Sequence, residues 1–252
     1  MTDDEHFGEW DLWLDRVRKD IENVVIGRHV YEEVEALVRE NPSLHQPSSF
    51  YDLMTTTFSA WAAMAVRRQM EADSVSLARL LAAIEKRPKV ISRKRFVSIY
   101  IAKIRPASMV QAAEELVPRA SGAYLPGPEF FEDIANRTFD KYVAADAEHV
   151  VGSLVNAERR SLWEKAEKVQ AFASKRIAHL VEQPTEIPTM DELGECVDAF
   201  ENTVLRYFNV ISGVRAVSTT SNLAIRLEGY LQNALVAECQ LGRSRCSHKT
   251  QG

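Results

Sequence analysis

The chain has 252 residues, of which 46% are apolar and 27% charged, and its 31 basic and 36 acidic residues give a net charge of −5. This is the usage of a folded protein rather than of a disordered chain, and the 10 glycines are few for an all-β fold with its many tight turns. The acidic start lacks the apolar core of a signal peptide, and no 18-residue apolar run predicts a transmembrane helix, so we expect a cytoplasmic protein without membrane contact.

Apolar residues recur at intervals of three and four along most of the first hundred residues, which is the spacing of one face of a helix. We predict a first helix interrupted at Gly27 and a strongly apolar second helix near the centre of the core. A short third helix is capped by Asp73-Ser74 or by Ser76 and ended by Pro88. The next element contains a run at 96–101 that also favours a β-strand, so the sequence does not decide between helix and strand there. The three helices are expected at about 7–40, 49–71 and 77–84.

The second half of the chain repeats this helical spacing after a segment rich in proline and glycine, which predicts a loop at 118–128. Capping boxes, in which Ser or Thr is followed three residues later by Gln or Glu, predict helix starts at Ser108 and Thr189. Gly213 is a candidate C-cap for the helix that Thr189 begins. Further helices are expected at about 129–148, 152–182 and 220–239.

These elements predict an all-α fold, a bundle of long antiparallel helices with no alternation of strands and helices. We expect one domain over 1–215, in which an N-terminal half at about 7–117 packs against a C-terminal half at about 129–213. Residues 216–252 would add a further helix and a disordered basic tail. The four Trp residues lie on or beside apolar stripes, so we expect them to anchor the core or an interface rather than to stack on bases.

The basic residues are concentrated in one segment, 86–105, which holds eight Lys or Arg and no acidic residue and leaves the remainder of the chain at −13 (23 basic, 36 acidic). Clustered cations neutralise phosphates, so this segment is a candidate contact for an RNA backbone. The alternative is a solvated helix face that pairs with the acidic remainder. Arg67 and Arg68 end an apolar helix, and two interpretations of them stay open. They either contact a phosphate or form an ion pair that fixes the helix corner. The candidate RNA-binding residues are Arg93, Lys94, Arg95, Arg67 and Arg68.

The motifs of nucleotide-binding loops, serine hydrolases and zinc proteases are absent from the sequence. The three Cys form no disulfide framework and have no metal-ligand spacing, so we expect no cofactor and no metal. One histidine stands apart, because His179 follows Lys175 and Arg176 by four and three residues, on about one side of a long helix. Cations there favour the neutral, basic imidazole and would hold a phosphate, which is the minimum for metal-free RNA cleavage. The alternative is a helix-terminal His with two snorkelling cations.

Several segments follow one another in a distinctive order. They are Asn41 to Tyr51, Trp61 to Gln69, Asp73 to Leu81, Phe172 to Leu180, and Pro188 to Leu193 with a long apolar helix that contains Arg206, Tyr207 and Phe208. In this order and spacing, the chain resembles the HEPN superfamily over about residues 8–212. More narrowly, it resembles the AbiU-type abortive-infection branch.

The resemblance implies an α-helical bundle that often pairs into a homodimer. Active members of the family cleave RNA without a metal in toxin–antitoxin and antiphage systems. Their motif, an Arg followed after four to six residues by a His, carries over to His179 as the catalytic His. The Arg would fall at residues 172–174, where none stands, so Lys175 or Arg176 would supply the cation, with Ser174 as the polar residue of the motif.

Two hypotheses for the function stay open. In the first, the chain is an endoribonuclease of such a defence system, with His179, Arg176, Lys175 and Ser174 as its catalytic residues. In the second, it is a non-catalytic HEPN module that binds RNA, a nucleotide or a protein partner such as an antitoxin.

Overall fold

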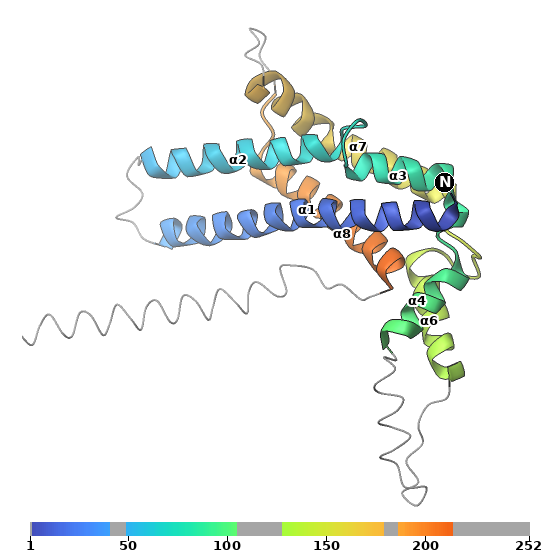
Figure 1. Cartoon of the computed structure of the whole chain (residues 1–252). Coiled ribbons are helices and arrows are strands. Elements are labelled where there is room, and N and C mark those ends of the chain that lie inside the picture. The colour runs from blue at the N-terminus through green and yellow to red at the C-terminus, as the bar shows by residue number, and fades with distance from the viewer. Residues whose placement is uncertain (1, 41–48, 105–127, 179–185, 214–252) are drawn as a thin grey trace, which may run out of the picture. The chain divides into compact units, whose positions relative to one another are not determined.

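The computed structural model describes residues 2–40, 49–104, 128–178 and 186–213 (Figure 1). The chain divides into two units, Met1–Ala216 and Val217–Gly252, and all described residues belong to the first. These residues confirm the predicted all-α class and contain no β-strand. Several predicted features lie outside the described residues: the helix starting at Ser108, residues 118–127 of the loop, His179 and the helix at about 220–239.

Two long helices form the first antiparallel pair of the fold, α1 over Asp3–Glu40 and α2 over Ser49–Gln69 (Figure 1). Their spans agree with the prediction, but the predicted interruption at Gly27 is wrong, because α1 continues through it. The glycine serves packing instead. A Cβ atom at Gly27 would lie 2.4 Å from Cζ3 of Trp61 on α2, so only a hydrogen atom fits beneath the indole ring. The two helices approach closely here because the glycine has no side chain.

A short connection, residues 70–76, leads from α2 into the short helix α3, Leu77–Lys86. Ser76 is its N-cap, because the Ser76 Oγ accepts a 3.2 Å hydrogen bond from the backbone N–H three residues on. Pro88 begins a short 3-10 turn, η2, Pro88–Val90, which confirms that α3 ends before it. The next helix, α4, spans Arg93–Ile104, so the segment that the sequence left open between helix and strand is helical.

The helix predicted at about 129–148 ends earlier than expected, because α6 spans Pro128–Tyr142. Asp146 adopts a left-handed backbone conformation with φ of 57°, and a right-handed helix cannot continue through it. Its backbone N–H donates a 3.2 Å hydrogen bond to Oδ1 of Asp140, which stabilises the turn. The chain then runs beside the start of α4, where the N–H of Val150 donates to the carbonyl of Ile91 at 3.0 Å.

The last two described helices are α7, Gly152–Phe172, and α8, Met190–Ser212. Helix α7 continues as a π-helical turn, η3, over Ala173–Ala178. The capping box predicted at Thr189 is confirmed, because its Oγ1 accepts from the N–H of Glu192 and the Glu192 carboxylate accepts from the N–H of Thr189. Gly213 is the C-cap of α8 in the left-handed conformation, with φ of 63°, as predicted.

The core lies where these helices meet within the first unit. Helix α8 makes its most extensive contact with α1, while α3 packs on α7 and α4 packs on α6. Buried aromatic side chains come from several elements, including Trp10 on α1, Phe96 on α4 and Phe200 on α8. Among the helices that the structure describes, none is both long and apolar enough to cross a membrane.

Candidate functional site

The segment that the sequence singled out lies at the end of α7. Ser174, Lys175 and Arg176 all belong to the π-helical turn η3, where Ser174 is half-buried and Lys175 is exposed. The side chain of Arg176 and the whole of His179 lie outside what the structure describes. The structure therefore places the first part of the predicted motif and leaves the position of its histidine untested.

The local geometry differs from the regular helix that the sequence predicted. Leu162, Ala166, Val169 and Ala173 are buried at the expected spacing of three and four, which confirms the inward stripe of α7. From Ala173 onward the hydrogen bonds span five residues instead of four, so the turn is wider and successive side chains are spaced differently around it. The turn also packs against α2. Single π-helical turns are rare, and they occur frequently at functional sites.

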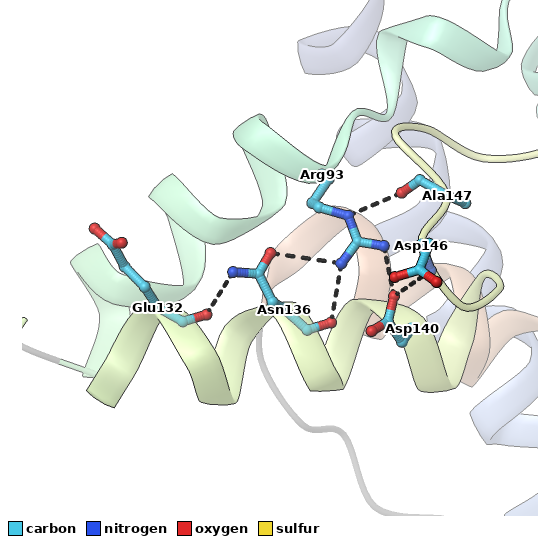
Figure 2. A network of polar contacts seen from close by, with 6 residues as sticks. All are labelled: Arg93, Glu132, Asn136, Asp140, Asp146 and Ala147. Atoms are coloured by element: carbon cyan, nitrogen blue, oxygen red, sulfur yellow. Dashed lines mark hydrogen bonds and ion pairs between the residues drawn. The ribbon is translucent and has the colours of Figure 1, made fainter. Parts of the chain in front are cut away.

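Arg93, the first of the candidate RNA-binding residues, is held inside the protein (Figure 2). Its Nε donates to the carbonyl of Ala147 at 2.9 Å, its Nη1 to the carbonyl and Oδ1 of Asn136 at 3.3 and 3.5 Å, and its Nη2 to the carboxylate of Asp140. The guanidinium also lies 4.9 Å from the centre of the Phe139 ring. Because its side chain is only 16% exposed and its donors are used internally, Arg93 joins α4 to α6 and the following turn.

Arg95 has a similar structural position, whereas Lys94 between them is exposed. Nη1 of Arg95 donates to the carbonyl of Val90 at 2.5 Å, and Nη2 pairs with Asp4. Its guanidinium lies 4.8 Å from the ring centre of Phe7, so it joins α4 to the start of α1. Of the three candidates in this run, Lys94 is the one that the structure leaves accessible to an RNA phosphate.

At the end of α2 the structure supports an ion pair for Arg68, one of the two interpretations that the sequence left open. Nη2 of Arg68 lies 2.8 Å from Oδ1 of Asp20 on α1, and the amide of Gln69 donates to the other carboxylate oxygen at 2.7 Å. Gln69 in turn accepts a 3.0 Å hydrogen bond from the N–H of Leu77. The contacts of Arg68 and Gln69 thereby join the end of α2 to α1 and to the start of α3, while the neighbouring Arg67 is half-buried.

A groove that the sequence analysis did not identify lies between the first part of α1, α3 and the first half of α7. Its volume is about 560 Å³, and a second hollow of about 270 Å³ shares Arg159 and Trp163 with it. Trp163 is 52% exposed, since it follows the inward-facing Leu162 by one residue and points away from the apolar stripe of α7. Cations and indoles line the groove: Arg79, Lys86, Arg87, Arg159, Trp10, Trp13 and Trp163.

Two buried groups elsewhere in the fold are poor candidates for chemistry. Burial raises the pKa of the Cys196 thiol to about 12, so it is not a thiolate nucleophile near neutral pH. Burial also raises the pKa of Tyr207, whose hydroxyl donates a 2.9 Å hydrogen bond to Glu158. Within the described ranges, no group of three or more His, Cys, Asp or Glu side chains is arranged to hold a metal ion.

No family model matches the chain, and comparisons with curated proteins and with solved structures give no match either.

Proposed function

We propose that this chain is a HEPN-like protein of a bacterial antiphage or toxin–antitoxin system, and that it cleaves RNA without a metal, with His179 as general acid–base. The observation that carries this proposal is the π-helical turn Ala173–Ala178. It follows the regular turns of α7 and contains Lys175 and Arg176, the first two residues of the Lys-Arg-x-x-His cluster. An irregular turn of this kind is costly to keep in a helix, and function is a frequent reason for keeping it.

The chemistry follows from the residue types of the cluster. As a neutral base, the His179 imidazole removes the proton of a ribose 2′-hydroxyl, and the 2′-oxygen attacks the adjacent phosphorus. The bond to the 5′-oxygen breaks, and that oxygen takes a proton from the His179 imidazolium or from water that the imidazolium protonates, which leaves a 2′,3′-cyclic phosphate, a free 5′-hydroxyl and neutral His179. Lys175 and Arg176 stabilise the additional negative charge of the pentacoordinate phosphorane, and Ser174 supplies a hydrogen bond. In a homodimer, two copies of the cluster would share one cleft.

A non-catalytic HEPN module is the second candidate, and one observation favours it. Residues 172–174, where the family's Arg would stand, are Phe, Ala and Ser. A site with no cation at that position can still bind RNA, a nucleotide or a protein partner through Lys175 and Arg176. The two candidates differ in cleavage and not in the residues that they use, so a kinetic experiment separates them.

The experiment is cleavage of a mixed RNA pool by the full chain in EDTA, followed by gel electrophoresis. We expect cleavage without metal, a loss of at least about 100-fold in the His179→Ala variant, and a smaller loss in Lys175→Ala. Lys165→Ala is the matched control, because Lys165 is an exposed lysine on the same helix, and its rate should be unchanged. Circular dichroism of each variant checks that the helices are intact.

Three other results would each have a definite meaning. Equal cleavage by the parent chain and His179→Ala would remove His179 from the mechanism. Binding of RNA without cleavage would support the non-catalytic module instead. Neither binding nor cleavage of RNA would contradict the ribonuclease and would leave a nucleotide or a protein partner as the ligand of the non-catalytic module.

A further inference from the structure

The groove between α1, α3 and α7 has aromatic surfaces that are suited to flat ligands. Trp163 lies half-exposed on α7 where the two hollows meet. Trp13, in the same groove, already has the Arg79 guanidinium over its ring, 4.4 Å from the ring centre. A nucleic-acid base presents the same kind of planar π-face, and exposed indoles and Arg guanidinium planes are the usual stacking partners of unpaired bases.

The groove also concentrates positive charge on a chain whose net charge is −5. Lys86 and Arg87 are exposed at the end of α3, and Arg159 lines the groove from α7. Arg159 is oriented by a 2.9 Å ion pair with Glu85. Among the described residues of the lining, Glu9 is the one carboxylate. Cations clustered beside indoles are the combination that single-stranded nucleic acids require, because phosphates and bases are then bound together.

A third observation comes from His6, which lines the same groove. Its Nε2 is buried and has no hydrogen-bond partner among the described residues. A buried polar atom without a partner is unfavourable, so this nitrogen favours a ligand that brings a donor or an acceptor. Ribose hydroxyls and base edges both provide one.

We infer that this groove binds single-stranded RNA, with a base stacked on Trp163 and phosphates bound by Lys86, Arg87 and Arg159. The inference rests on the proposed function, since it names the surface that holds the RNA. A chain of nucleotides is favoured over a free nucleotide because the surface continues on both sides of Trp163, through the larger and the smaller hollow. Small-molecule sites instead enclose most of their ligand.

In the groove, the RNA contact lies at the start of the basic segment 86–105 and not at its centre. The sequence pointed to 86–105 as a whole, but Arg93 and Arg95 in its centre are used to hold the fold together. Lys86 and Arg87, at its start, face the groove instead. Trp163 lies on α7, and the π-helical turn η3 continues that helix, so Trp163 and Ser174 are separated by about 16 Å along its axis at about 1.5 Å per residue.

The test measures binding of a fluorescein-labelled, unstructured 12-nucleotide RNA by fluorescence anisotropy, with the full-length His179→Ala protein so that the probe is not consumed. We expect Trp163→Ala to weaken binding about tenfold and Trp163→Phe to retain most of it, because a phenyl ring still stacks. The double variant Lys86→Gln/Arg87→Gln should weaken binding about tenfold at low salt. Arg137→Gln/Lys141→Gln, which removes two exposed cations from α6, is the matched control and should change binding less than twofold.

The remaining outcomes would overturn the inference. Adenosine monophosphate that competes as well as the RNA would show a site for free nucleotides. Unchanged RNA binding in Trp163→Ala, together with a change of oligomeric state in sedimentation, would show a protein interface. Failure of the inference is distinct from failure of the proposed function, because RNA cleavage by the parent chain is measured separately and does not require Trp163 to be the contact.

Discussion

Arg93 connects the start of α4 to α6 and the turn that follows it, partners that lie 43 to 54 residues further along the chain. It lies at the start of α4, and its partners are Asn136 and Asp140 on α6 and Ala147 in the following turn (Figure 2). Its hydrogen bond to Asp140 is the main cause that lowers the pKa of that carboxyl group. An Arg with this many fixed partners stabilises the fold, because removing it leaves several acceptors without a donor.

We predict that Arg93→Met lowers the free energy of unfolding by about 2 kcal/mol near pH 7, because charge-assisted hydrogen bonds are lost and their acceptors stay behind. The control is Lys94→Met at the exposed neighbouring position, which should change stability by less than about 0.5 kcal/mol. Urea denaturation followed by circular dichroism measures both. Equal effects of the two substitutions would contradict a structural role for Arg93.

The position of these partners explains what the sequence could predict at the residue scale. The basic run 86–105 is visible in the sequence, and so is the pairing alternative, since the remainder of the chain is acidic. The particular carboxylate is not visible, because Asp140 is 47 residues from Arg93 and only the packing of α4 on α6 brings it near. The groove around Trp163 was missed for the same reason, since its walls come from three helices.

The start of α8 shows how one helix end is fixed by local and distant groups together. Thr189 and Glu192 form the capping box, and Nζ of Lys168 on α7 lies 2.7 and 2.8 Å from the two Glu192 carboxylate oxygens. Lys168 also lies 2.9 Å from Glu186. These contacts lower the pKa of Glu192, chiefly through Lys168, and raise the pKa of Lys168, chiefly through Glu192. The end of α7 and the start of α8 are thereby held together.

We predict that Thr189→Ala lowers the free energy of unfolding by about 1 kcal/mol, the usual effect of losing an N-cap. Glu192→Gln should be destabilising at pH 7 and nearly neutral in strong acid. Because the folded-state pKa of Glu192 is lowered, its stabilising contribution is present above the ordinary carboxyl pKa of about 4.3. It is lost as the pH falls through the lowered value.

Denaturant unfolding of the parent chain and of Glu192→Gln between pH 7 and pH 2.5 measures this difference. Glu195→Gln, at an exposed position on the same helix, is the control and should show little effect at any pH. A stability difference for Glu192→Gln that does not shrink in acid would contradict the ion pair with Lys168.

At the scale of elements, the sequence predicted the helix features that depend on residues near one another in the chain. It missed the features that depend on packing between helices. The helical spans and the capping box at Thr189 follow from periodicity and from residues three apart. Gly27 misled the prediction because its role depends on Trp61, which comes from another helix. The π-helical turn at Ala173–Ala178 has no composition that distinguishes it from an α-helix, so the predicted helix ran through it.

At the scale of the whole molecule, the groove is rich in cations while the chain as a whole is acidic. Residues 217–252 include Arg243, Arg245 and Lys249, and without this segment the chain has 27 basic and 34 acidic residues, a net charge of −7. An acidic protein repels RNA on average, so binding has to come from a local set of cations in direct contact with phosphates. The groove provides such a set in the first unit, whereas the C-terminal cations belong to the second.

We predict that residues 1–216, produced alone with His179→Ala, fold with the same unfolding midpoint as the full chain and bind the 12-nucleotide RNA with the same affinity.

The dependence of binding on salt gives the sharper test, because each phosphate contact with a single strand contributes about 0.7 to the slope of log K against log salt. The three phosphate-binding cations of the groove, Lys86, Arg87 and Arg159, predict a slope of about −2 in both proteins, and Lys86→Gln/Arg87→Gln should reduce its magnitude by about 1.4. A slope whose magnitude falls on truncation instead, with little effect of the groove substitutions, would place the RNA contact on the cations of residues 217–252. Equal slopes in the two proteins that respond to Lys86 and Arg87 would place it in the groove.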